Sequence, residues 1–279
     1  MTEHLAAQLA ATFGLSDVVA VEGGHQAQVF TAVGPDGSLI VKVIDAALTD
    51  AAAVLARVTM VAILADAEPA VCRPLVHAGR LVHEVDLPVS GTGLATLWEF
   101  AEGRAPDPGD HSDAALMGAT LARLHTAMAM LDPSAVPAVA TYRGELPSAS
   151  WQVLHGDFNT ANLRIDIDGA GVRVFDFDDC GRGPIEFDVA NAIYMVLFDS
   201  HLAGTPAVAQ RFRTALLHGY SQQSGITLSG DVLDREIDRR VDALAGWLNV
   251  PETAPVGIRT STDEWKHVLR AFVDTHRHP

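Results

Sequence analysis

The sequence predicts an α+β fold with a small β-rich N-terminal lobe and a larger, mainly helical C-terminal lobe. Short apolar runs bounded by Gly, Pro and Asp dominate the N-terminal part, and such runs are typical of strands. Further along, apolar residues recur at intervals of three and four over long stretches, as in amphipathic helices. Between the two parts, residues 104–109 hold two prolines and a glycine, the composition of a linker. We therefore expect lobes at 1–103 and 104–279.

The N-terminal part begins with a short amphipathic helix, because Leu5, Leu9 and Phe13 fall on one helical face. After it, apolar runs bounded by turn residues indicate strands. A second helix is expected at 50–65, with Thr49 or Asp50 as its N-cap. The expected strands are 18–21, 28–33, 39–44, 75–77, 80–85 and 96–103.

The C-terminal part is expected to be mostly helical, with one hairpin near its middle. Apolar residues alternate with polar ones at 163–167 and 172–175, and the segment between these runs begins Asp-Gly. Asp-Gly between two such runs is a strong hairpin signal. Helical periodicity predicts helices at 112–130, 187–198, 206–220, 230–248 and 262–273.

The expected hairpin gathers polar side chains at its open end. A hairpin of this length returns its two ends to one edge, so Asn162 and Asp176 are expected side by side. Asp157 lies in the loop just before them. A loop carboxylate next to a second carboxylate and an amide suits phosphoryl transfer from a Mg²⁺-bound nucleotide. It offers a base for the acceptor hydroxyl and hard oxygen ligands for the metal.

Three residues in the N-terminal part fit phosphate binding. Gly23 and Gly24 lie between two expected strands, where glycine lets the backbone approach a ligand, although alone the pair is better explained as a tight turn. Lys42 interrupts an apolar strand, so its amine either reaches solvent at a sheet edge or is held on a polar partner. A glycine turn followed by a strand lysine predicts a lid over phosphates with a cation beneath it.

The charge balance limits the kinds of partner. Nineteen Lys and Arg against 35 Asp and Glu give a net charge of −16, which disfavours binding to nucleic acid. Net charge alone favours a role in solubility over an acidic wall for a cationic substrate. The N-terminus lacks the pattern of a signal peptide, and no apolar stretch is long enough to span a membrane. The two cysteines match no metal spacing, so we expect a cytoplasmic enzyme without a membrane partner.

The central segment resembles a known family. Residues 155–162, HGDFNTAN, fit the pattern H-G-D-x-x-x-x-N, and FDFDD at 175–179 follows at hairpin distance, with EFDVA at 186–190 after it. With the glycine turn and Lys42, these motifs resemble the aminoglycoside phosphotransferase family, whose kinase-like fold is shared with choline and homoserine kinases. The resemblance covers nearly the whole chain. It implies a two-lobed protein-kinase-like fold.

The resemblance implies a role for each residue of the central motifs. Asp157 would orient the acceptor hydroxyl and take its proton as the catalytic base. Asn162 and Asp176 would hold Mg²⁺ on the nucleotide phosphates. His155 and Asp188 are interpreted as scaffolding that fixes the catalytic loop.

The resemblance also assigns the nucleotide contacts. Lys42 would neutralise the α and β phosphates of ATP or GTP. Gly23 and Gly24 would cover the triphosphate with backbone N–H groups. The adenine ring would pair with the backbone of Trp98, Glu99 and Phe100.

The sequence departs from the family pattern at two places. Kinases pair the strand lysine with a glutamate on the following helix, but residues 51–64 contain no acid. Asp45, Asp66 and Glu68 are the alternative carboxylates for Lys42. In the second place, Asp178 stands where a glycine commonly follows the metal-binding aspartate and its aromatic neighbour. The extra acid adds negative charge near the metal and makes the loop less supple.

Acidic residues beyond the catalytic loop bear on the substrate. Together with the net charge and the phosphotransferase motifs, they favour a cationic acceptor over a purely solvated acidic face. An antibiotic, either an aminoglycoside or a basic cyclic peptide of the capreomycin and viomycin type, is the first choice, and its phosphorylation would confer resistance. The candidate substrate residues are Asp178, Asp179, Glu186, Asp231 and Asp234.

Two alternatives stay open at this stage. The first is a metabolic small-molecule kinase acting on homoserine, choline or an amino sugar. The second is a binding module that has lost catalysis, which only the missing helix glutamate supports, since Asp157, Asn162 and Asp176 are all present. For an antibiotic kinase and for a metabolic kinase alike, we expect a monomer or weak dimer with a small-molecule partner and no nucleic acid.

Overall fold

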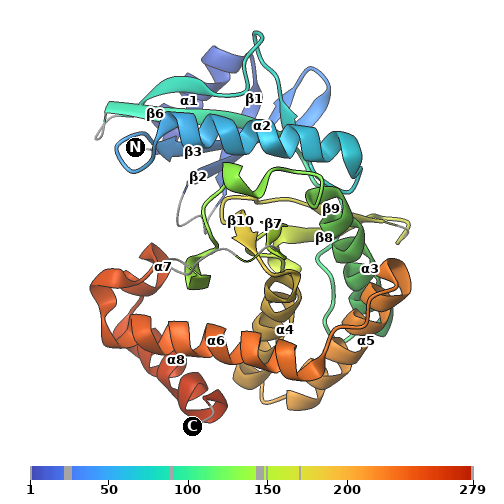
Figure 1. Ribbon diagram of the computed structural model, residues 1–279. Helices are drawn as coiled ribbons and strands as arrows, with labels where there is room; N and C mark the ends of the chain where they lie inside the picture. Colours follow the sequence, from blue (N-terminus) through green and yellow to red (C-terminus); the bar gives the residue numbers. More distant parts are fainter. Residues whose placement is uncertain are drawn as a thin grey trace. The chain divides into compact units, whose positions relative to one another are not determined.

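The computed structural model describes residues 2–21, 27–87, 91–142, 148, 150–169 and 171–277. The chain forms two compact units, residues 1–101 and residues 102–279. The first is built around an antiparallel sheet and the second mainly from helices (Figure 1). The predicted α+β fold class is confirmed. No helix in this described part is both long enough and apolar enough to cross a membrane.

An antiparallel sheet organises the first unit. Its strands are β1 (Ser16–Val21), β2 (Gln28–Gly34), β3 (Gly37–Asp45), β4 (Pro74–Leu75), β5 (His83–Leu87) and β6 (Gly91–Glu99). The spatial order is β1-β2-β3-β6-β4, and β5 pairs with β6. Lys42 of β3 lies opposite Val29 of β2 and Thr96 of β6. The lysine is therefore on a central strand and not at an edge of the sheet.

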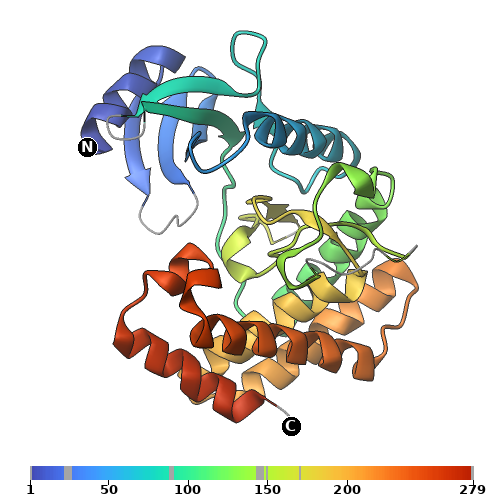
Figure 2. The ribbon, with the colours of Figure 1, turned by 60° about the vertical axis from the view of Figure 1, so that its left-hand side comes forward.

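Two helices cover opposite faces of this sheet (Figure 2). Helix α1 (Thr2–Phe13) buries Leu5, Leu9 and Phe13 against one face, as their spacing predicts. Helix α2 (Ala51–Ala67) begins at its N-cap Asp50, whose side chain accepts a hydrogen bond from the backbone N–H of Ala52. It packs against the other face. Since side chains alternate along a strand, Lys42 shares the α2 face with Ile44.

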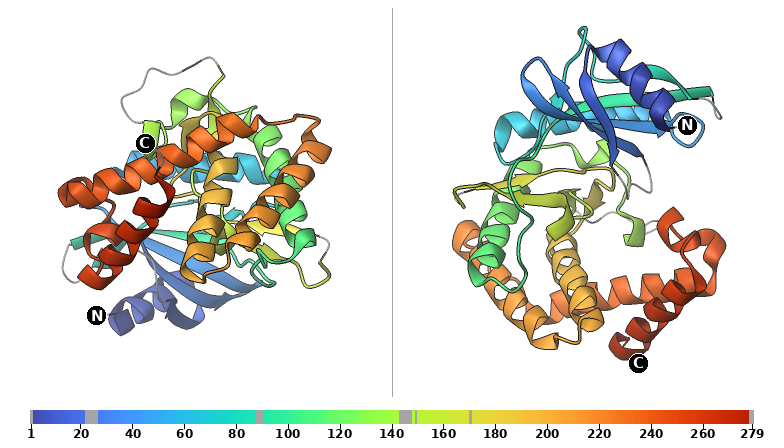
Figure 3. Two further views of the ribbon diagram at one scale, coloured as in Figure 1. Left: turned by 90° about the horizontal axis from the view of Figure 1, so that it is seen from below. Right: turned by 180° about the vertical axis from the view of Figure 1, so that it is seen from behind.

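The second unit is a group of helices with two small pairs of strands. The helices are α3 (His111–Met128), α4 (Ile185–Leu202), α5 (Pro206–Ser224), α6 (Gly230–Asn249), α7 (Val256–Arg259) and α8 (Asp263–His276). Helices α3 and α5 touch at backbone level. A Cβ atom at Gly118 would lie 2.0 Å from the carbonyl oxygen of Leu216, and one at Gly219 would lie 1.9 Å from that of Ala115. Helix α6 packs across α4 (Figure 3).

The strand pairs carry the central motifs. The expected hairpin is present as β8 (Leu163–Ile165) and β9 (Val172–Val174). A second pair, β7 (Gln152–Leu154) with β10 (Gly181–Gly183), was not expected from the sequence. Short 3-10 turns occur at Pro133–Ala135, Ala140–Tyr142, Thr160–Asn162 and Pro251–Thr253.

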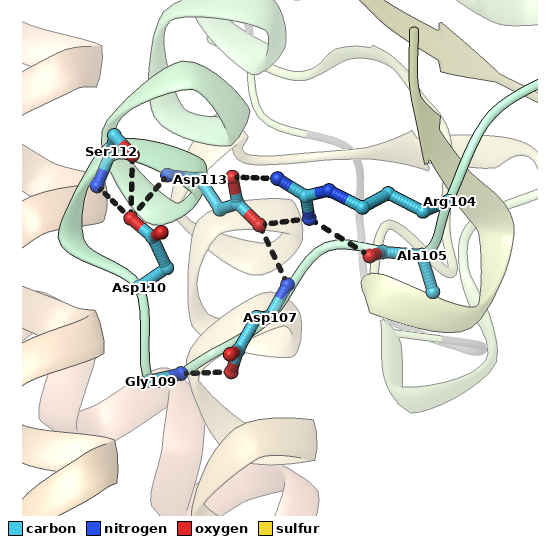
Figure 4. Close-up of polar contacts among 7 residues, drawn as sticks. All are labelled: Arg104, Ala105, Asp107, Gly109, Asp110, Ser112 and Asp113. Carbon is cyan, nitrogen blue, oxygen red and sulfur yellow. Dashed lines mark hydrogen bonds and ion pairs between the residues drawn. The ribbon is translucent and has the colours of Figure 1, made fainter. Parts of the chain in front are cut away.

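The segment that opens the second unit is held by an acid at the start of α3. Arg104 donates two hydrogen bonds to the carboxylate of Asp113, and the backbone N–H of Asp107 donates a third at 2.8 Å (Figure 4). Arg104 also exchanges backbone hydrogen bonds with Ile165 of β8, at 3.0 and 2.7 Å. A Cβ at Gly103, which has φ of +114°, would collide with the Ile165 carbonyl. This proline-containing stretch is therefore fixed to the hairpin.

Candidate active site

Asp157 is held by two amide side chains. The Nδ2 atom of Asn162 donates to the Oδ2 atom and to the backbone oxygen of Asp157, both at 2.9 Å. The Nδ2 atom of Asn191, a buried residue of α4, donates to the Oδ1 atom of Asp157 at 3.3 Å. Both carboxylate oxygens are thus oriented before any substrate binds. A group fixed in this way is suited to accept a proton from a defined direction.

The backbone before Asp157 is anchored on Asp188. This fully buried carboxylate accepts hydrogen bonds from the backbone N–H groups of His155 and Gly156, at 2.8 and 2.9 Å. A third comes from Nε2 of His125, at 3.3 Å. Burial alone would raise the pKa of Asp188, but the hydrogen bonds that it accepts from His125 and from the backbone N–H of Gly156 favour the ionised form, and this pKa lies below its ordinary value. Asp188 is therefore an ionised anchor for the catalytic loop.

His125 connects this anchor to α5. Its Nδ1 atom lies 2.9 Å from the hydroxyl oxygen of Tyr220. Because Nε2 donates to Asp188, a neutral ring leaves Nδ1 as the acceptor of the Tyr220 proton. Burial, together with the charges of Glu186 and Asp188, raises the pKa of Tyr220, so the hydroxyl keeps the proton that it donates. His125 is thus a buried, hydrogen-bonded structural residue.

His155 uses both ring nitrogens inside the loop. The backbone N–H of Asp157 donates to Nδ1 at 3.2 Å, and Nε2 lies 3.1 Å from the backbone oxygen of Phe175. This pattern requires a neutral ring with its proton on Nε2. The ring also packs on Phe177, with 4.4 Å between the centroids. His155 therefore ties the loop of Asp157 to the end of the hairpin.

The glycine of the H-G-D motif is required by a close approach. Gly156 has φ of +84°, and a Cβ there would lie 1.9 Å from the backbone oxygen of Asp179. Any side chain would push the segment after the hairpin away from Asp157. That segment affects the base, because burial raises the pKa of Asp157 and the charge of Asp179 raises it further. The positive charge of Arg240 and the hydrogen bond from Asn191 oppose this rise.

The hairpin brings the two expected metal residues to one end. The backbone N–H of Phe175 donates to the backbone oxygen of Asn162 at 3.2 Å, so Asp176 follows directly beside Asn162. Asp176 is exposed and has φ of +65°, a conformation that costs energy for a residue with a side chain. Since Nδ2 of Asn162 faces Asp157, the oxygen of this amide is left to bind a cation. An amide oxygen and a carboxylate are ligands that Mg²⁺ accepts, with phosphates completing its shell.

In the first unit, Lys42 is 9% exposed. Of its three alternative carboxylates, Asp66 forms a surface ion pair with Arg73 at 2.7 Å, and Asp45 accepts a hydrogen bond from the backbone N–H of Ala47. Glu68 is the buried one of the three. It follows Val54, Val58, Val61 and Ala65 at helical spacing on the buried side of α2. Glu68 therefore continues the buried stripe of this helix, on the face that packs against the sheet.

The remaining nucleotide residues lie around the end of β6. Trp98 and Glu99 pair with Ile40 and Leu39 of β3, and the backbone N–H of Glu99 donates to the backbone oxygen of Arg73. Phe100 follows the last paired residue, and its side chain is 38% exposed. The glycines at positions 23 and 24 lie outside the described residues. The adenine contacts of this segment stay a prediction.

Comparison with known proteins identifies the family. The sequence model described as the phosphotransferase enzyme family matches residues 17–142 and 136–227, well over half of the chain. The chain belongs to this family. It is a small-molecule phosphotransferase, as the sequence predicted. None of the curated proteins compared matches the sequence.

Solved structures share the fold of this phosphotransferase. Amicoumacin kinase, solved with AMP-PNP, Ca²⁺ and Ami, is 18% identical, with a TM-score of 0.74 over 99% of this chain and 96% of its own. A microcompartment-associated aminopropanol kinase is 17% identical, with a TM-score of 0.72 over 98% and 95%. Spectinomycin phosphotransferase, solved with ADP and spectinomycin, is 11% identical, with a TM-score of 0.65 over 99% and 97%. The protein-kinase-like fold is thereby confirmed.

The expected substrate residues of the phosphotransferase belong to the segment after the hairpin and to helices α4 and α6. Asp178 is half-buried and Asp179 is exposed, in the segment that packs on Gly156. Glu186 lies at the start of α4, and its charge helps to raise the pKa of Tyr220 on α5. Asp231 and Asp234 lie exposed on α6, where Asp234 pairs with Arg213 of α5. Their roles in substrate binding stay predictions.

Sequence reasoning did not single out the polar groups that α4 and α6 bring to Asp157. Asn191 is buried within an apolar stretch of α4, and this placement was the available signal, since buried amides need partners. Arg240 packs its guanidinium over Phe187 and Tyr194 of α4, and its charge lowers the pKa of Asp157. The crossing of α4 and α6 decides its position.

Proposed function

We propose that this phosphotransferase transfers the γ-phosphate of ATP or GTP to a hydroxyl group of a cationic small molecule, in a reaction that requires Mg²⁺. The observation that carries the proposal is the arrangement around Asp157. Its carboxylate is oriented by Asn162 and Asn191, and the end of the hairpin beside it presents the oxygens of Asn162 and Asp176. A base next to hard oxygen ligands is the combination that phosphoryl transfer to an alcohol needs.

In the reaction, Asp157 positions the acceptor hydroxyl and takes its proton. The hydroxyl oxygen forms a bond to the γ-phosphorus, and the bond between that phosphorus and the β–γ bridging oxygen breaks, so that the nucleoside diphosphate leaves. Burial raises the pKa of Asp157, which makes the carboxylate a better base than an exposed aspartate. Asp188 and His155 keep the loop in place during this step.

The remaining residues serve the nucleotide. Asn162 and Asp176 would hold Mg²⁺, which supplies positive charge to the transferring phosphoryl group. Lys42 would neutralise the α and β phosphates, and the backbone that follows β6 would bind the base. Nucleotides and a divalent cation in the amicoumacin kinase and spectinomycin phosphotransferase structures support this assignment.

For the acceptor, we infer an antibiotic, because the net charge of −16 favours a cation and two of the structures similar to this chain are antibiotic kinases. Aminoglycosides and basic cyclic peptides such as capreomycin are the classes to test. The similarity to an aminopropanol kinase favours a second candidate, a metabolic kinase for a small amino alcohol.

Mass spectrometry tests both functions. The purified protein is incubated with ATP or GTP, Mg²⁺ and a panel of antibiotics, amino alcohols, hydroxy amino acids and amino sugars. We expect one added phosphate on a cationic acceptor, and its loss in Asp157→Asn. Turnover of a metabolic amino alcohol, with none on any antibiotic, would replace the first candidate by the second. Failure to phosphorylate any hydroxyl compound would refute the proposed function.

A further inference from the structure

Two oppositely charged residues lie one turn apart on α6, and aromatic rings of other elements contact both. Glu236 contacts Tyr142 of the 3-10 turn at Ala140–Tyr142. The hydroxyl of Tyr142 donates a hydrogen bond to Oε1 of Glu236 at 2.6 Å. Arg240 lies over Phe187 and Tyr194 of α4, with its guanidinium carbon 5.6 and 5.2 Å from the ring centroids. Residues four apart share a helix face, so both are on the side that packs across α4.

Glu236 presents one carboxylate oxygen without a hydrogen-bond donor. The residue is 8% exposed, and within the described part of the chain no donor reaches Oε2. The nearest cation is Nε of Arg239, at 3.7 Å, which exceeds a hydrogen bond. An unpaired carboxylate oxygen in a buried position is costly, because it has given up its water. An ammonium group of a ligand would supply the missing donor.

In Arg240, the group without a hydrogen-bond partner is a donor. Its Nε–H is buried and finds no acceptor among the residues that the structure describes, and its ring contacts leave the charge without a carboxylate partner there. Its charge nonetheless acts on Asp157. A guanidinium offers two parallel N–H groups to a carboxylate or to a carbonyl oxygen. An acceptor molecule with such an oxygen close to its reacting hydroxyl would satisfy it.

The amide of Asn191 links these groups to the base. Asn191 lies between Phe187 and Tyr194 on one face of α4, since the three are spaced by four and three residues. Its Nδ2 atom is used by Asp157, while its buried Oδ1 atom has no donor among the described residues. Three side chains close to Asp157 or on the adjoining face of α6 thus each have one buried polar atom without a hydrogen-bond partner among the described residues, and one is an acid, one a base and one an amide.

We propose that the acceptor carries an ammonium group and a carbonyl oxygen together with its hydroxyl. Glu236 binds the ammonium group, and Arg240 binds the carbonyl oxygen of a carboxylate or an amide. The acceptor is therefore amino-acid-like or peptide-like rather than a polyamine sugar, which has no such oxygen for Arg240. The inference rests on the proposed function and narrows its substrate class.

Four small probes isolate each group. L-homoserine has the hydroxyl, ammonium and carboxylate groups, and its primary amide replaces the carboxylate by a neutral carbonyl. 3-Amino-1-propanol lacks the carbonyl group, and 4-hydroxybutanoate lacks the ammonium group. Binding is measured by calorimetry and turnover by phosphate transfer. We expect homoserine or its amide to bind about tenfold more tightly than either truncated probe, the loss typical of one charged hydrogen bond. Whichever of homoserine and its amide binds more tightly shows whether the site takes a carboxylate or an amide.

Three variants assign the preference to residues. Arg240→Met should remove the advantage over 3-amino-1-propanol and leave the affinity for that amine unchanged. Glu236→Gln, which keeps an acceptor for Tyr142, should remove the advantage over 4-hydroxybutanoate. Arg277→Met is the matched control, because Arg277 pairs with Asp242 at the exposed end of α8. If Arg240→Met does not fold, Arg240→Lys takes its place, and the preference among the four probes tests the proposal without any variant.

The outcomes separate this inference from the proposed function. Equal affinity for homoserine, its amide and 3-amino-1-propanol would overturn the inference, as would phosphorylation of aminoglycosides alone. In both cases the mass-spectrometric assay of phosphate transfer still decides the kinase assignment. Selective binding of homoserine or its amide without phosphate transfer to any hydroxyl would uphold the subsite and refute the kinase.

Discussion

The catalytic loop of the second unit and the lysine strand of the first differ in how their functional side chains are held. Around Asp157, hydrogen bonds join the carboxylate to Asn162 and Asn191, and further hydrogen bonds hold the loop on His155 and Asp188. Around Lys42, residues 51–64 of α2 contain no acid, and a buried acid, Glu68, follows the end of the helix. Proton transfer depends on exact geometry, whereas a lysine only needs a nearby counter-charge.

The largest effect is expected from the base itself. Asp157→Asn keeps the shape and removes the proton acceptor, so kcat should fall about a thousandfold, within the range of general-base catalysis. Binding of ATP, measured by calorimetry, should not change. A variant that kept its kcat would show that Asp157 is not the base.

The next effect tests the anchor of the loop. In Asp188→Asn, one acceptor oxygen becomes an amide donor that faces the backbone N–H of either His155 or Gly156. Removing this buried charge should cost about 3 to 5 kcal/mol in the free energy of unfolding. Chemical denaturation measures the loss, and kcat should fall as well because the loop loses its position. Unchanged stability would mean that the loop is held by other contacts.

A smaller effect is expected when the counter-charge of Lys42 is removed. We propose Glu68 as the counter-charge of Lys42, since it is buried and continues the buried stripe of α2. Glu68→Gln should raise the KM for ATP about tenfold, equivalent to about 1.4 kcal/mol. Asp66→Asn is the control, because its exposed pair with Arg73 contributes little. The opposite result, with Asp66→Asn impairing ATP binding and Glu68→Gln neutral, would assign the role to Asp66.

The pH dependence of kcat/KM probes the segment after the hairpin. Asp157 must be ionised to act, and burial, followed by the charge of Asp179, raises its pKa. Activity of the wild type should therefore fall on the acid side at a pH above the ordinary aspartate value of 3.8. Removing the neighbouring charge in Asp179→Asn lowers the pKa of Asp157, so the variant should stay active to a lower pH. A shift to higher pH would contradict this placement of Asp179.

The last prediction concerns the ion pair in the segment that opens the second unit. The hydrogen bonds from Arg104 lower the pKa of Asp113 in the folded protein, more than burial raises it. The resulting stabilisation is present above the ordinary pKa of 3.8 and is lost as pH falls through the lower folded value. Asp113→Asn should cost about 2 kcal/mol at neutral pH, measured by denaturation, and much less in strong acid. A difference that is independent of pH would contradict the ion pair.

Local patterns predicted the parts of the fold that depend on neighbours in sequence. The α1 face of Leu5, Leu9 and Phe13 and the Asp-Gly hairpin are confirmed, because periodicity and turn chemistry encode them directly. The β7–β10 pair was missed, since each strand has three residues and finds its partner far along the chain. No local signal could specify that pairing.

The candidate site shows the same limit. Spacing of polar residues predicted that Asn162 and Asp176 meet, and backbone hydrogen bonding across the hairpin brings them together. For α6, the sequence proposed Asp231 and Asp234 as substrate residues but did not tell which face of the helix is inward. The structure turns Glu236 and Arg240 inward and leaves Asp234 exposed. The crossing of α4 and α6 decides this, and crossings depend on the whole packed unit.

The contact between α3 and α5 has a consequence for how the enzyme can vary. Gly118 and Gly219 let the two backbones touch, and the same helices carry His125, two turns after Gly118, and Tyr220, next to Gly219. The separation between the helices therefore sets the length of the hydrogen bond from Tyr220 to His125, whose other ring nitrogen contacts Asp188. A methyl group at either glycine would wedge the helices apart and act on proton transfer without touching a substrate. Activity therefore depends on two glycines, positions that have no side chain.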